Sequence, residues 1–332
     1  MNVVSSAIYL PSQAVASRYL DARMNREVGS VERDFKIKTR YYADSTETAD
    51  IMGFRALESA LDKAGLSIEG IDCLIAACGT SAQELPYNAA SIYRHFESNR
   101  RIHTFDVNMT CLSFVQALEL SSLYLAAGKY KRVAIVCSER ASVGLDPDSY
   151  ETSSIFGDGA SAFIFGGKPG DGSFEPISFR FETVHEAFDA CVIPSGGTSL
   201  PPSQIGKSFT LEQHIKQSYF RMDGKKLYRY VFKDLKPYVT RHLGDHGLSM
   251  DEIDLVIPHQ ASAHGLAHVQ KVLGIEDDKF FNIFEHFGNQ VSVSIPLSLH
   301  LALERGLLPK GSKALLLGTS AGMSFGTALL QF

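Results

Sequence analysis

Tryptophan is absent from this chain of 332 residues, so no site in it can depend on an indole ring. Cysteine is scarce as well. The five cysteines are widely spaced and odd in number, and they include neither a C-x-x-C pair nor a cysteine and histidine cluster at zinc spacing. We therefore expect neither a disulfide framework nor a structural metal.

Long apolar runs and an excess of positive charge are also missing. No apolar stretch approaches the roughly 20 residues that cross a bilayer, and the N-terminus lacks the basic flank of a signal peptide. A net charge of -5, with 21% charged and 45% hydrophobic residues, offers no basic surface to nucleic acid or to an anionic membrane. We expect a globular, cytoplasmic protein without a membrane or nucleic-acid partner.

Nucleotide-binding loops are absent or out of context. The stretch from Gly157 to Ala162, GDGASA, formally matches G-x-G-x-x-A, but an apolar segment typical of a strand follows it. A dinucleotide site needs a helix there, because the N-terminus of that helix holds the pyrophosphate. No G-x-x-x-x-G-K-[ST] loop is present either. The sequence supports neither a nicotinamide site nor an ATP site.

The chain contains an internal repeat. Residues 65–75, GLSIEGIDCLI, recur 182 residues later (from 65 to 247) as GLSMDEIDLVI, with six of eleven positions identical. Each copy follows an amphipathic helix, over 56–64 and 235–243, and leads into a short apolar strand. A second similar pair, 132–138 and 313–319, has nearly the same offset. We expect two duplicated α/β halves at 1–168 and 169–332, with a glycine-rich hinge over 166–173.

Cys111 is the strongest candidate for a nucleophile. It lies in residues 104–114, TFDVNMTCLSF, where an apolar strand pattern stops and a helical pattern that runs to Gly128 begins. The positive end of a helix and the free N–H groups of its first turn favour thiolate over thiol. A lone cysteine is more often a small buried hydrophobe, so this interpretation depends on its partners.

Two partners come from the second half of the chain. His259 follows the repeated strand, and strand ends in α/β proteins carry active-site residues; Asn289 lies in a Gly-Asn turn before another helix. An amide and an imidazole N–H can together donate to a thioester carbonyl oxygen as it gains negative charge. His264 and His268 follow at one-turn spacing, but no glutamate follows His264 as an H-E-x-x-H metal site requires. With Cys111, the pattern indicates an acyl-transfer site.

Five segments, in order, resemble the β-ketoacyl-acyl-carrier-protein synthase III family of the thiolase superfamily. They are residues 106–114 around the cysteine, 155–162, 257–262, 287–296 and 318–328. The resemblance covers essentially the whole chain. It implies an α/β thiolase-like fold of two duplicated βαβαβαββ halves in five α-β-α-β-α layers, assembled as a homodimer, and the internal repeat is what such a duplication would leave.

The resemblance also implies a chemistry. Cys111 would take an acyl group from acyl-CoA or acyl carrier protein, and His259 with Asn289 would hold a malonyl thioester on acyl carrier protein during a decarboxylative condensation. Backbone N–H groups of Cys111 and Ala321 would form a second oxyanion hole. An acyltransferase of this kind uses no metal or organic cofactor, and serves fatty acid or specialised lipid and polyketide synthesis. The other substrate-binding positions implied are Leu85, Phe156, Met222, Gly224, Ser262 and Phe325.

Some positions depart from the family. The family's tryptophan that stacks on the adenine of CoA, and an arginine beside it, are matched here by Ser30 and Asp34, which predicts altered CoA docking. A run of three glycines is matched by residues 320–322, SAG. Leu85 replaces a phenylalanine that reaches into the acyl pocket of the partner subunit. The smaller side chain predicts a starter longer than acetyl.

Two other functions remain open on the sequence. The same acyl-cysteine could condense head-to-head with a second acyl thioester or pass its acyl group to another acceptor, and Glu84 lies near the position of a glutamate in head-to-head enzymes. The chain could instead be a non-catalytic thiolase-fold subunit, although such subunits typically lose one of the three catalytic residues. Docking of a carrier protein needs a basic surface, for which Lys225, Lys226 and Lys271 are candidates.

Overall fold

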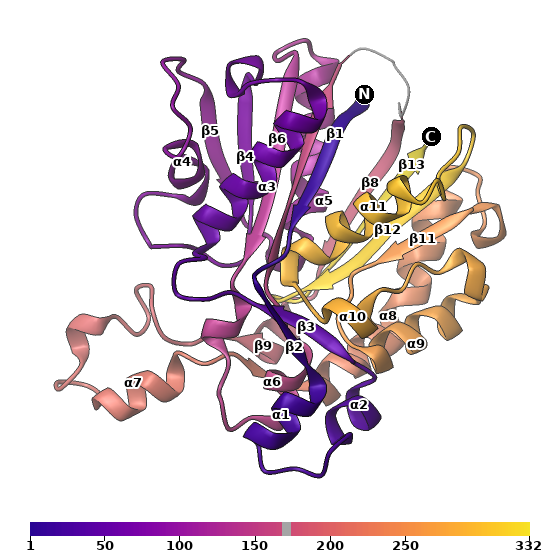
Figure 1. Cartoon of the computed structure of the whole chain (residues 1–332). Helices are drawn as coiled ribbons and strands as arrows, with labels where there is room; N and C mark the ends of the chain where they lie inside the picture. The colour runs from indigo at the N-terminus through magenta and orange to yellow at the C-terminus, as the bar shows by residue number, and fades with distance from the viewer. Residues whose placement is uncertain (168–173) are drawn as a thin grey trace.

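Two sheets dominate the computed structural model, which describes residues 1–167 and 174–332 (Figure 1). The first sheet has the order β1-β7-β6-β4-β5. Its strands are β1 (Asn2–Tyr9), β4 (Cys73–Ala77), β5 (His103–Val107), β6 (Arg132–Glu139) and β7 (Gly159–Gly166). The second sheet has the order β11-β12-β13-β8. Its strands are β8 (Glu175–Thr183), β11 (Leu255–Pro258), β12 (Lys313–Ser320) and β13 (Ser324–Gln331).

The two sheets have the same connectivity. β7 runs antiparallel between β1 and β6, and β4 is parallel to β6. In the second sheet β13 likewise runs antiparallel between β8 and β12, and β11 is parallel to β12. Even β5 has a counterpart, because Val256 and Phe280 form an isolated parallel bridge beside β11. This architecture confirms the duplication that the repeated segments predict.

Helices form three layers around the sheets. α5 (Ser113–Ala126) and α11 (Ser294–Glu304) lie between the two sheets (Figure 1). α3 (Ala49–Ala64) covers the outer face of the first sheet, and α8 (Gly224–Gly244) with α9 (Ala263–Leu273) covers that of the second. Both central helices are apolar on nearly all sides, because each faces a sheet on either side. The order of layers is the predicted α-β-α-β-α arrangement of the thiolase fold.

The inner strands β4 and β7 are buried along their whole length. Such burial is expected for strands covered by helices on both faces. β7 is also the strand that the sequence predicts after the Gly157 motif, and the chain does not enter a helix there. This rigid core fixes the strand ends that carry the candidate site.

Smaller elements complete the molecule. An antiparallel ribbon pairs β2 (Gln13–Ala16) with β3 (Thr39–Tyr42), and a short one pairs β9 (Cys191–Val192) with β10 (Arg221–Met222). The remaining α-helices are α1 (Ser17–Arg23), α2 (Ser30–Phe35), α4 (Asn88–Tyr93), α6 (Tyr150–Ile155), α7 (Leu211–Gln217) and α10 (Phe284–Phe287). α7 lies on an arm that projects from the body (Figure 1).

The predicted boundary between the halves, at 168/169, lies outside the described residues, as does most of the hinge predicted over 166–173. β7 ends at Gly166 and β8 begins at Glu175, so no described element tests the boundary and the division stays a prediction. Among the described residues, none of the helices combines the length and apolar character that a membrane span needs.

Candidate active site

Cys111 lies where β5 gives way to α5, as the sequence predicts. A 3₁₀ turn, η2 (Thr110–Leu112), joins the two elements. The turn is locked at both ends: Asn108 Oδ1 accepts the Thr110 N–H at 3.0 Å, and the Ser113 hydroxyl donates to the Thr110 carbonyl at 2.7 Å. Cys111 is thereby presented, half-buried, at the N-terminal end of α5.

A matching turn in the second half carries Asn289. There the 3₁₀ turn η8 (Val291–Val293) leads into α11, and Asn289 Oδ1 accepts the Val291 N–H at 2.9 Å, as Asn108 does for Thr110. Thr110 and Val291 have φ angles of 47° and 50°, a left-handed conformation that is rare for β-branched residues. The duplicated halves thus build the nucleophile and the asparagine on the same kind of turn.

These hydrogen bonds decide which way the Asn289 amide faces. Because Oδ1 accepts from Val291, the amide nitrogen is the other end of the group, and it donates to the Ala261 carbonyl at 3.2 Å. An amide nitrogen carries two hydrogens. Among the described residues one of them is used, in the bond to the Ala261 carbonyl, so the other can be donated to a ligand. The backbone around Asn289 is also held, since its N–H donates to the Ile155 carbonyl at 2.8 Å.

His259 follows β11 and is only 7% exposed. The loop is held by Gln260, whose side chain donates to the Phe281 carbonyl at 3.1 Å and accepts the Ile283 N–H at 3.0 Å. Burial lowers the pKa of His259 to about 4, and its Nδ1 has no hydrogen-bond partner among the described residues. At neutral pH the imidazole is therefore uncharged, with one donor and one acceptor nitrogen.

Close backbone approach brings the three predicted catalytic residues together. A Cβ added to Gly318 on β12 would lie 3.0 Å from the Cβ of His259 and 3.0 Å from Cδ2 of Leu112, so any larger residue there would press on both neighbours. Leu112 adjoins Cys111, which places the nucleophile turn beside His259. The turns η2 and η8 contact each other, and Asn289 bonds the loop after His259.

The expectation that the Cys111 environment favours the thiolate is wrong for the free protein. Burial raises the pKa of the Cys111 thiol above its ordinary value, and Cys191 and Glu139 raise it further. Hydrogen bonds from its own N–H and from Thr110 lower the pKa, but less. Loss of hydration outweighs the helix end. Cys111 is a thiol at neutral pH, so a base would have to take its proton if the sulfur is to act as a nucleophile.

The expected second oxyanion hole is occupied by the protein itself. The Ala321 N–H, just beyond β12, donates to the Thr110 hydroxyl at 3.1 Å. Sequence reasoning did not identify Thr110, and its position directly before Cys111 was the available signal. It also missed Glu139, a fully buried carboxylate at the end of β6, for which a charged residue closing an apolar strand was the signal.

Two predicted substrate-binding residues lie close to other site groups. Met222 on β10 pairs with Cys191 on β9, and the Cys191 thiol raises the pKa of Cys111. Phe156 is buried and packs edge-on against Phe220, with 5.2 Å between ring centroids. Phe156 also forms an isolated parallel bridge with Asn289, so it lies beside the predicted asparagine of the site.

The other predicted substrate-binding residues have different environments. The Ser262 hydroxyl caps α9 by accepting the Gly265 N–H at 3.1 Å, and Gly224 begins α8. Phe325 is 1% exposed and packs against Tyr238, so it is a core residue, and its role towards substrate stays a prediction. Leu85 is 85% exposed, so in the single chain it lies on the surface and not in an acyl pocket.

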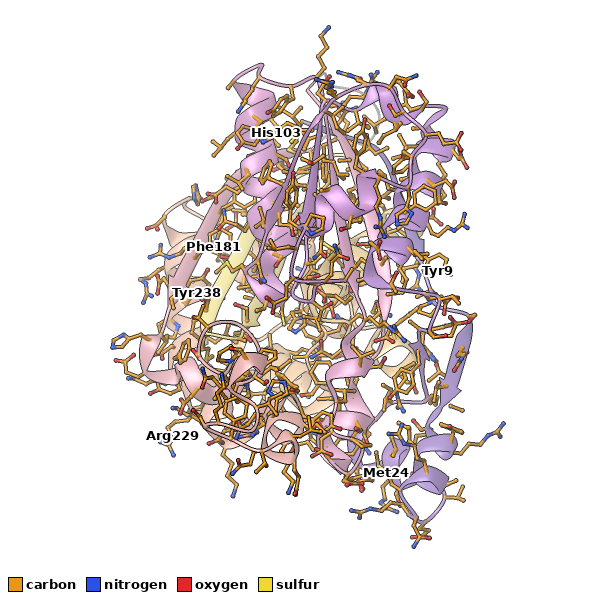
Figure 2. The ribbon with its side chains drawn as sticks, turned by 90° about the vertical axis from the view of Figure 1, so that its left-hand side faces the viewer. Tyr9, Met24, His103, Phe181, Arg229 and Tyr238 are labelled. Carbon is orange, nitrogen blue, oxygen red and sulfur yellow. The ribbon has the colours of Figure 1, made fainter. Side chains whose placement is uncertain are left out.

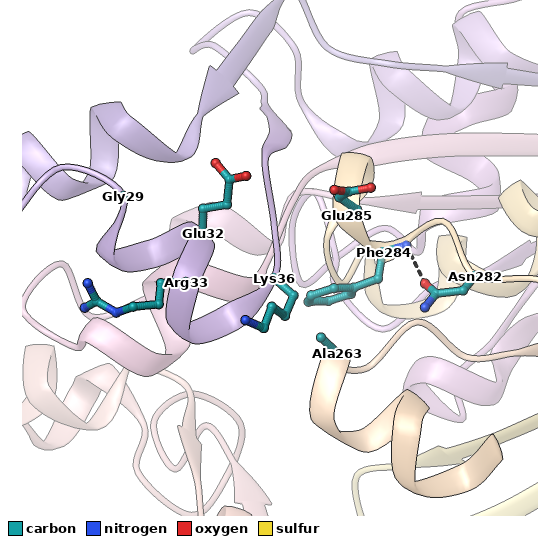
Figure 3. Close-up of a pocket in the computed structure, with 8 residues that line it drawn as sticks. All are labelled: Gly29, Glu32, Arg33, Lys36, Ala263, Asn282, Phe284 and Glu285. Carbon is teal, nitrogen blue, oxygen red and sulfur yellow. Dashed lines mark hydrogen bonds between the residues drawn. The ribbon is translucent and has the colours of Figure 1, made fainter. Parts of the chain in front are cut away.

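A groove with a volume of about 660 Å³ opens beside the start of α9 (Figure 3). Arg33 and Lys36 lie on one wall, and Phe284 and Glu285 lie on the other. The complete lining is Gly29, Glu32, Arg33, Lys36, Ala263, Asn282, Phe284 and Glu285. Within the described part of the chain, no group of three His, Cys, Asp or Glu side chains could hold a metal ion.

Known proteins resemble this chain over its whole length. A family model described as 3-oxoacyl-[acyl-carrier-protein (ACP)] synthase III matches residues 105–183, and its C-terminal companion matches 243–332. Over 303 residues the chain is 30% identical to a beta-ketoacyl-[acyl-carrier-protein] synthase III of Syntrophomonas wolfei, covering 91% of this chain and 88% of that protein. The chain belongs to the 3-oxoacyl-[acyl-carrier-protein] synthase III family.

Other relatives agree with this assignment. The synthase III of Clostridium tetani is 26% identical over 333 residues, covering 100% of this chain and 98% of that protein. The crystal structure of the synthase III from Aquifex aeolicus has the same fold, with a TM-score of 0.86 at 24% identity, covering 100% of this chain and 99% of that one. As a synthase III family member, the chain is a condensing enzyme of the acyltransferase class.

The resemblance matches Ser30 and Asp34 to the family's adenine-stacking pair, and the structure gives the surroundings of both residues. Ser30 is buried at the start of α2, and Asp34 forms an ion pair with Arg33 at 2.9 Å. The Tyr150 hydroxyl donates to Asp34 at 2.9 Å. An anionic group therefore stands in this chain at the position where the resemblance implies a cationic one.

Proposed function

We propose that this synthase III carries out a decarboxylative condensation in two half-reactions. In the first, the Cys111 sulfur attacks an acyl thioester, and the carrier thiol leaves with the proton. In the second, a malonyl thioester on acyl carrier protein loses CO2, and its enolate carbon attacks the acyl-cysteine. The products are CO2, a β-ketoacyl thioester and the Cys111 thiolate, which takes a proton from solvent to regenerate the thiol.

The orientation of the Asn289 amide is the observation that carries this proposal. Its nitrogen end is free to donate a hydrogen, in contact with the loop that carries His259. Donors placed where an enolate oxygen develops charge lower the barrier without a strong base, because loss of CO2 provides the carbanion. The depressed pKa of His259 supports a neutral N–H donor in this role. No metal or organic cofactor takes part.

The starter in this proposal is longer than acetyl. Leu85 would enter the acyl pocket of a second protomer in a homodimer, and its high exposure in the single chain supports such an insertion. A leucine fills less of a pocket than a phenylalanine, which leaves room for additional methylene groups. The Leu85→Phe variant should accordingly shift the preferred donor to a shorter acyl chain.

A basic face is the proposed docking surface for acyl carrier protein. It comprises the exposed residues Lys225, Arg229, Lys233 and Lys236 on α8 and Lys271 on α9. Figure 2 shows Arg229 pointing away from the body. Lys226, also a candidate from the sequence, is ion-paired with Asp189. A positive surface of this kind would steer an acidic carrier towards the site.

Intact-protein mass spectrometry tests the proposed function. Wild type and Cys111→Ala are incubated with acyl-CoAs of two to twelve carbons and then with malonyl-carrier protein. We expect acylation of wild type only, followed by malonyl-dependent discharge and a β-ketoacyl product. Acylation without malonyl-dependent discharge would favour head-to-head condensation or transfer to another acceptor, and no acylation by any donor would favour a non-catalytic subunit.

A further inference from the structure

The end of β6 carries a carboxylate that is completely buried. Glu139 accepts the Gly79 N–H at 2.5 Å, the Thr80 N–H at 2.9 Å and the Thr80 hydroxyl at 2.6 Å. It also accepts a hydrogen bond from the Ser292 hydroxyl. Burial raises the pKa of Glu139, and these donors act against that rise. A buried acid with this many partners holds its surroundings in one arrangement.

Ser292 occupies in η8 the place that Cys111 occupies in η2. Each is the middle residue of a 3₁₀ turn that begins at a residue with positive φ and leads into a central helix. The bond from Ser292 to Glu139 spans 153 residues and joins the sheet of the first half to the turn of the second. In the second half, therefore, a serine that is hydrogen-bonded to Glu139 stands where the first half has its predicted nucleophile, Cys111.

The hydrogen bond between Ser292 and Glu139 lies next to the backbone N–H that orients the Asn289 amide. Val291, directly before Ser292, is the residue whose N–H holds Asn289 Oδ1 and so turns the amide nitrogen outward. The left-handed conformation of Val291 is unfavourable for a β-branched side chain and persists only where neighbours hold it. The buried Ser292 hydroxyl, fixed on Glu139, is such a neighbour.

The same carboxylate holds the backbone that separates the two turns. A Cβ added to Gly79 would lie 3.0 Å from Cγ1 of Val291, 3.3 Å from Cα of Thr110 and 3.3 Å from Oε1 of Glu139. Gly79 is thus wedged between the asparagine turn and the nucleophile turn, and its N–H is bound by Glu139. Of the two turns, the asparagine turn alone has a side chain, Ser292, bonded to the carboxylate among the hydrogen bonds of the described residues.

We propose that Glu139 is a positioning residue for the condensing half-reaction, acting through Ser292 to hold the Asn289 amide towards the malonyl thioester. The inference rests on the proposed function, in which Asn289 serves the second half-reaction and not the first. Breaking the bond between Glu139 and Ser292 therefore slows discharge of the acyl-enzyme and leaves acylation of Cys111 intact. Small misplacements of a donor have large kinetic effects, of about a hundredfold per ångström.

The test measures both half-reactions by rapid-quench mass spectrometry in Ser292→Ala, Glu139→Leu, the double variant and Ser298→Ala. Ser298 is the matched control, because it is buried in α11 and its hydroxyl donates to the Ser294 carbonyl at 2.8 Å, away from Glu139. We expect Ser292→Ala to acylate within about twofold of wild type and to discharge about tenfold more slowly. Ser298→Ala should match wild type in both.

A double-mutant cycle shows whether the two residues act through one bond. The double variant should discharge no more slowly than Glu139→Leu alone, since leucine has no oxygen to accept from Ser292 and removing either partner breaks the same interaction. Additive losses, equal slowing of both half-reactions in Ser292→Ala, or discharge of Ser292→Ala at the rate of Ser298→Ala would overturn the inference. If Glu139→Leu does not fold, the comparison of the two serine variants decides alone. Failure of wild type to discharge with malonyl thioester would instead refute the proposed function.

Discussion

The backbone N–H of Ala321 donates a hydrogen bond of 3.1 Å to the hydroxyl of Thr110, across 211 residues of sequence. The bond joins the turn after β12 to the residue before Cys111. Ala321 provides one of the two N–H groups that we expect to receive the acyl carbonyl oxygen. An incoming acyl group therefore has to displace the Thr110 hydroxyl, which ties the start of acylation to the freedom of that side chain.

Two substitutions of Thr110 should differ in the rate of Cys111 acylation. In Thr110→Ser the hydroxyl remains and the unbranched side chain can turn away from Ala321 at little strain, so acylation should equal or exceed that of wild type. In Thr110→Val a methyl group stays where the acyl oxygen must approach, and acylation should fall about tenfold. Stopped-flow or quenched acylation assays measure both rates, and equal rates would disprove the displacement.

The Asn289→Asp variant should lose condensation and keep acylation. Its carboxylate can still accept the Val291 N–H, but it has no hydrogen for the malonyl carbonyl and places an oxygen against the Ala261 carbonyl. We expect malonyl-dependent discharge to fall at least about a hundredfold, as for removal of an oxyanion donor. Single-turnover assays of the two half-reactions check this, and an equal loss in both would assign Asn289 to the fold instead.

The buried histidines should make the stability of the protein depend on pH. Burial lowers the pKa of His259 to about 4, and that of His242 likewise, from an ordinary value of 6.5. Between these values the unfolded chain binds protons that the folded chain does not, so stability is lost as the pH falls from about 6.5 towards 4. At pH 5 the loss due to His259 is about 2 kcal/mol.

Replacement of His259 by glutamine removes this proton linkage at one site. The fall in the free energy of unfolding between pH 7.5 and pH 5, measured by urea titration, should be smaller in His259→Gln by about 2 kcal/mol. An identical fall in wild type and variant would show that His259 is not the buried neutral imidazole described above.

The basic face on α8 should affect the binding of carrier protein and not the rate of condensation itself. Reversing charge in Lys225→Glu/Arg229→Glu should raise the concentration of malonyl-carrier protein needed for discharge about tenfold and leave discharge by malonyl-CoA unchanged. The effect should shrink at high salt, because salt screens exposed charges. Lys310→Glu is the control, because it reverses an exposed charge outside α8 and α9. A loss with both malonyl donors would assign the face to stability.

Much of the architecture could be predicted because duplication leaves local patterns. The repeated segment before β4 and β11 and the strand-to-helix junction at Cys111 are readable over a dozen residues, and the structure confirms both. The convergence of Cys111, His259 and Asn289 follows from their places at the ends of strands and starts of helices. Their roles in catalysis stay predictions.

Other parts of the site depend on contacts that no local pattern encodes. Thr110 meets Ala321, and Glu139 meets Ser292, only because two halves of the fold pack together. The pKa of Cys111 was wrongly expected to be low because the sequence shows the helix end but not the burial that dominates it. Phe325 was assigned to substrate from its motif, and the structure adds that it is a core residue.

The most direct test of the central claim follows carbon dioxide in a single turnover. Acyl-loaded wild type is mixed with malonyl-carrier protein labelled in the free carboxyl group, and released label is counted against acyl-enzyme discharged. The account predicts one labelled CO2 for each acyl group that leaves Cys111, with an equal amount of β-ketoacyl product, and none of this product from Cys111→Ala. Discharge of the acyl group without release of labelled CO2 would contradict it.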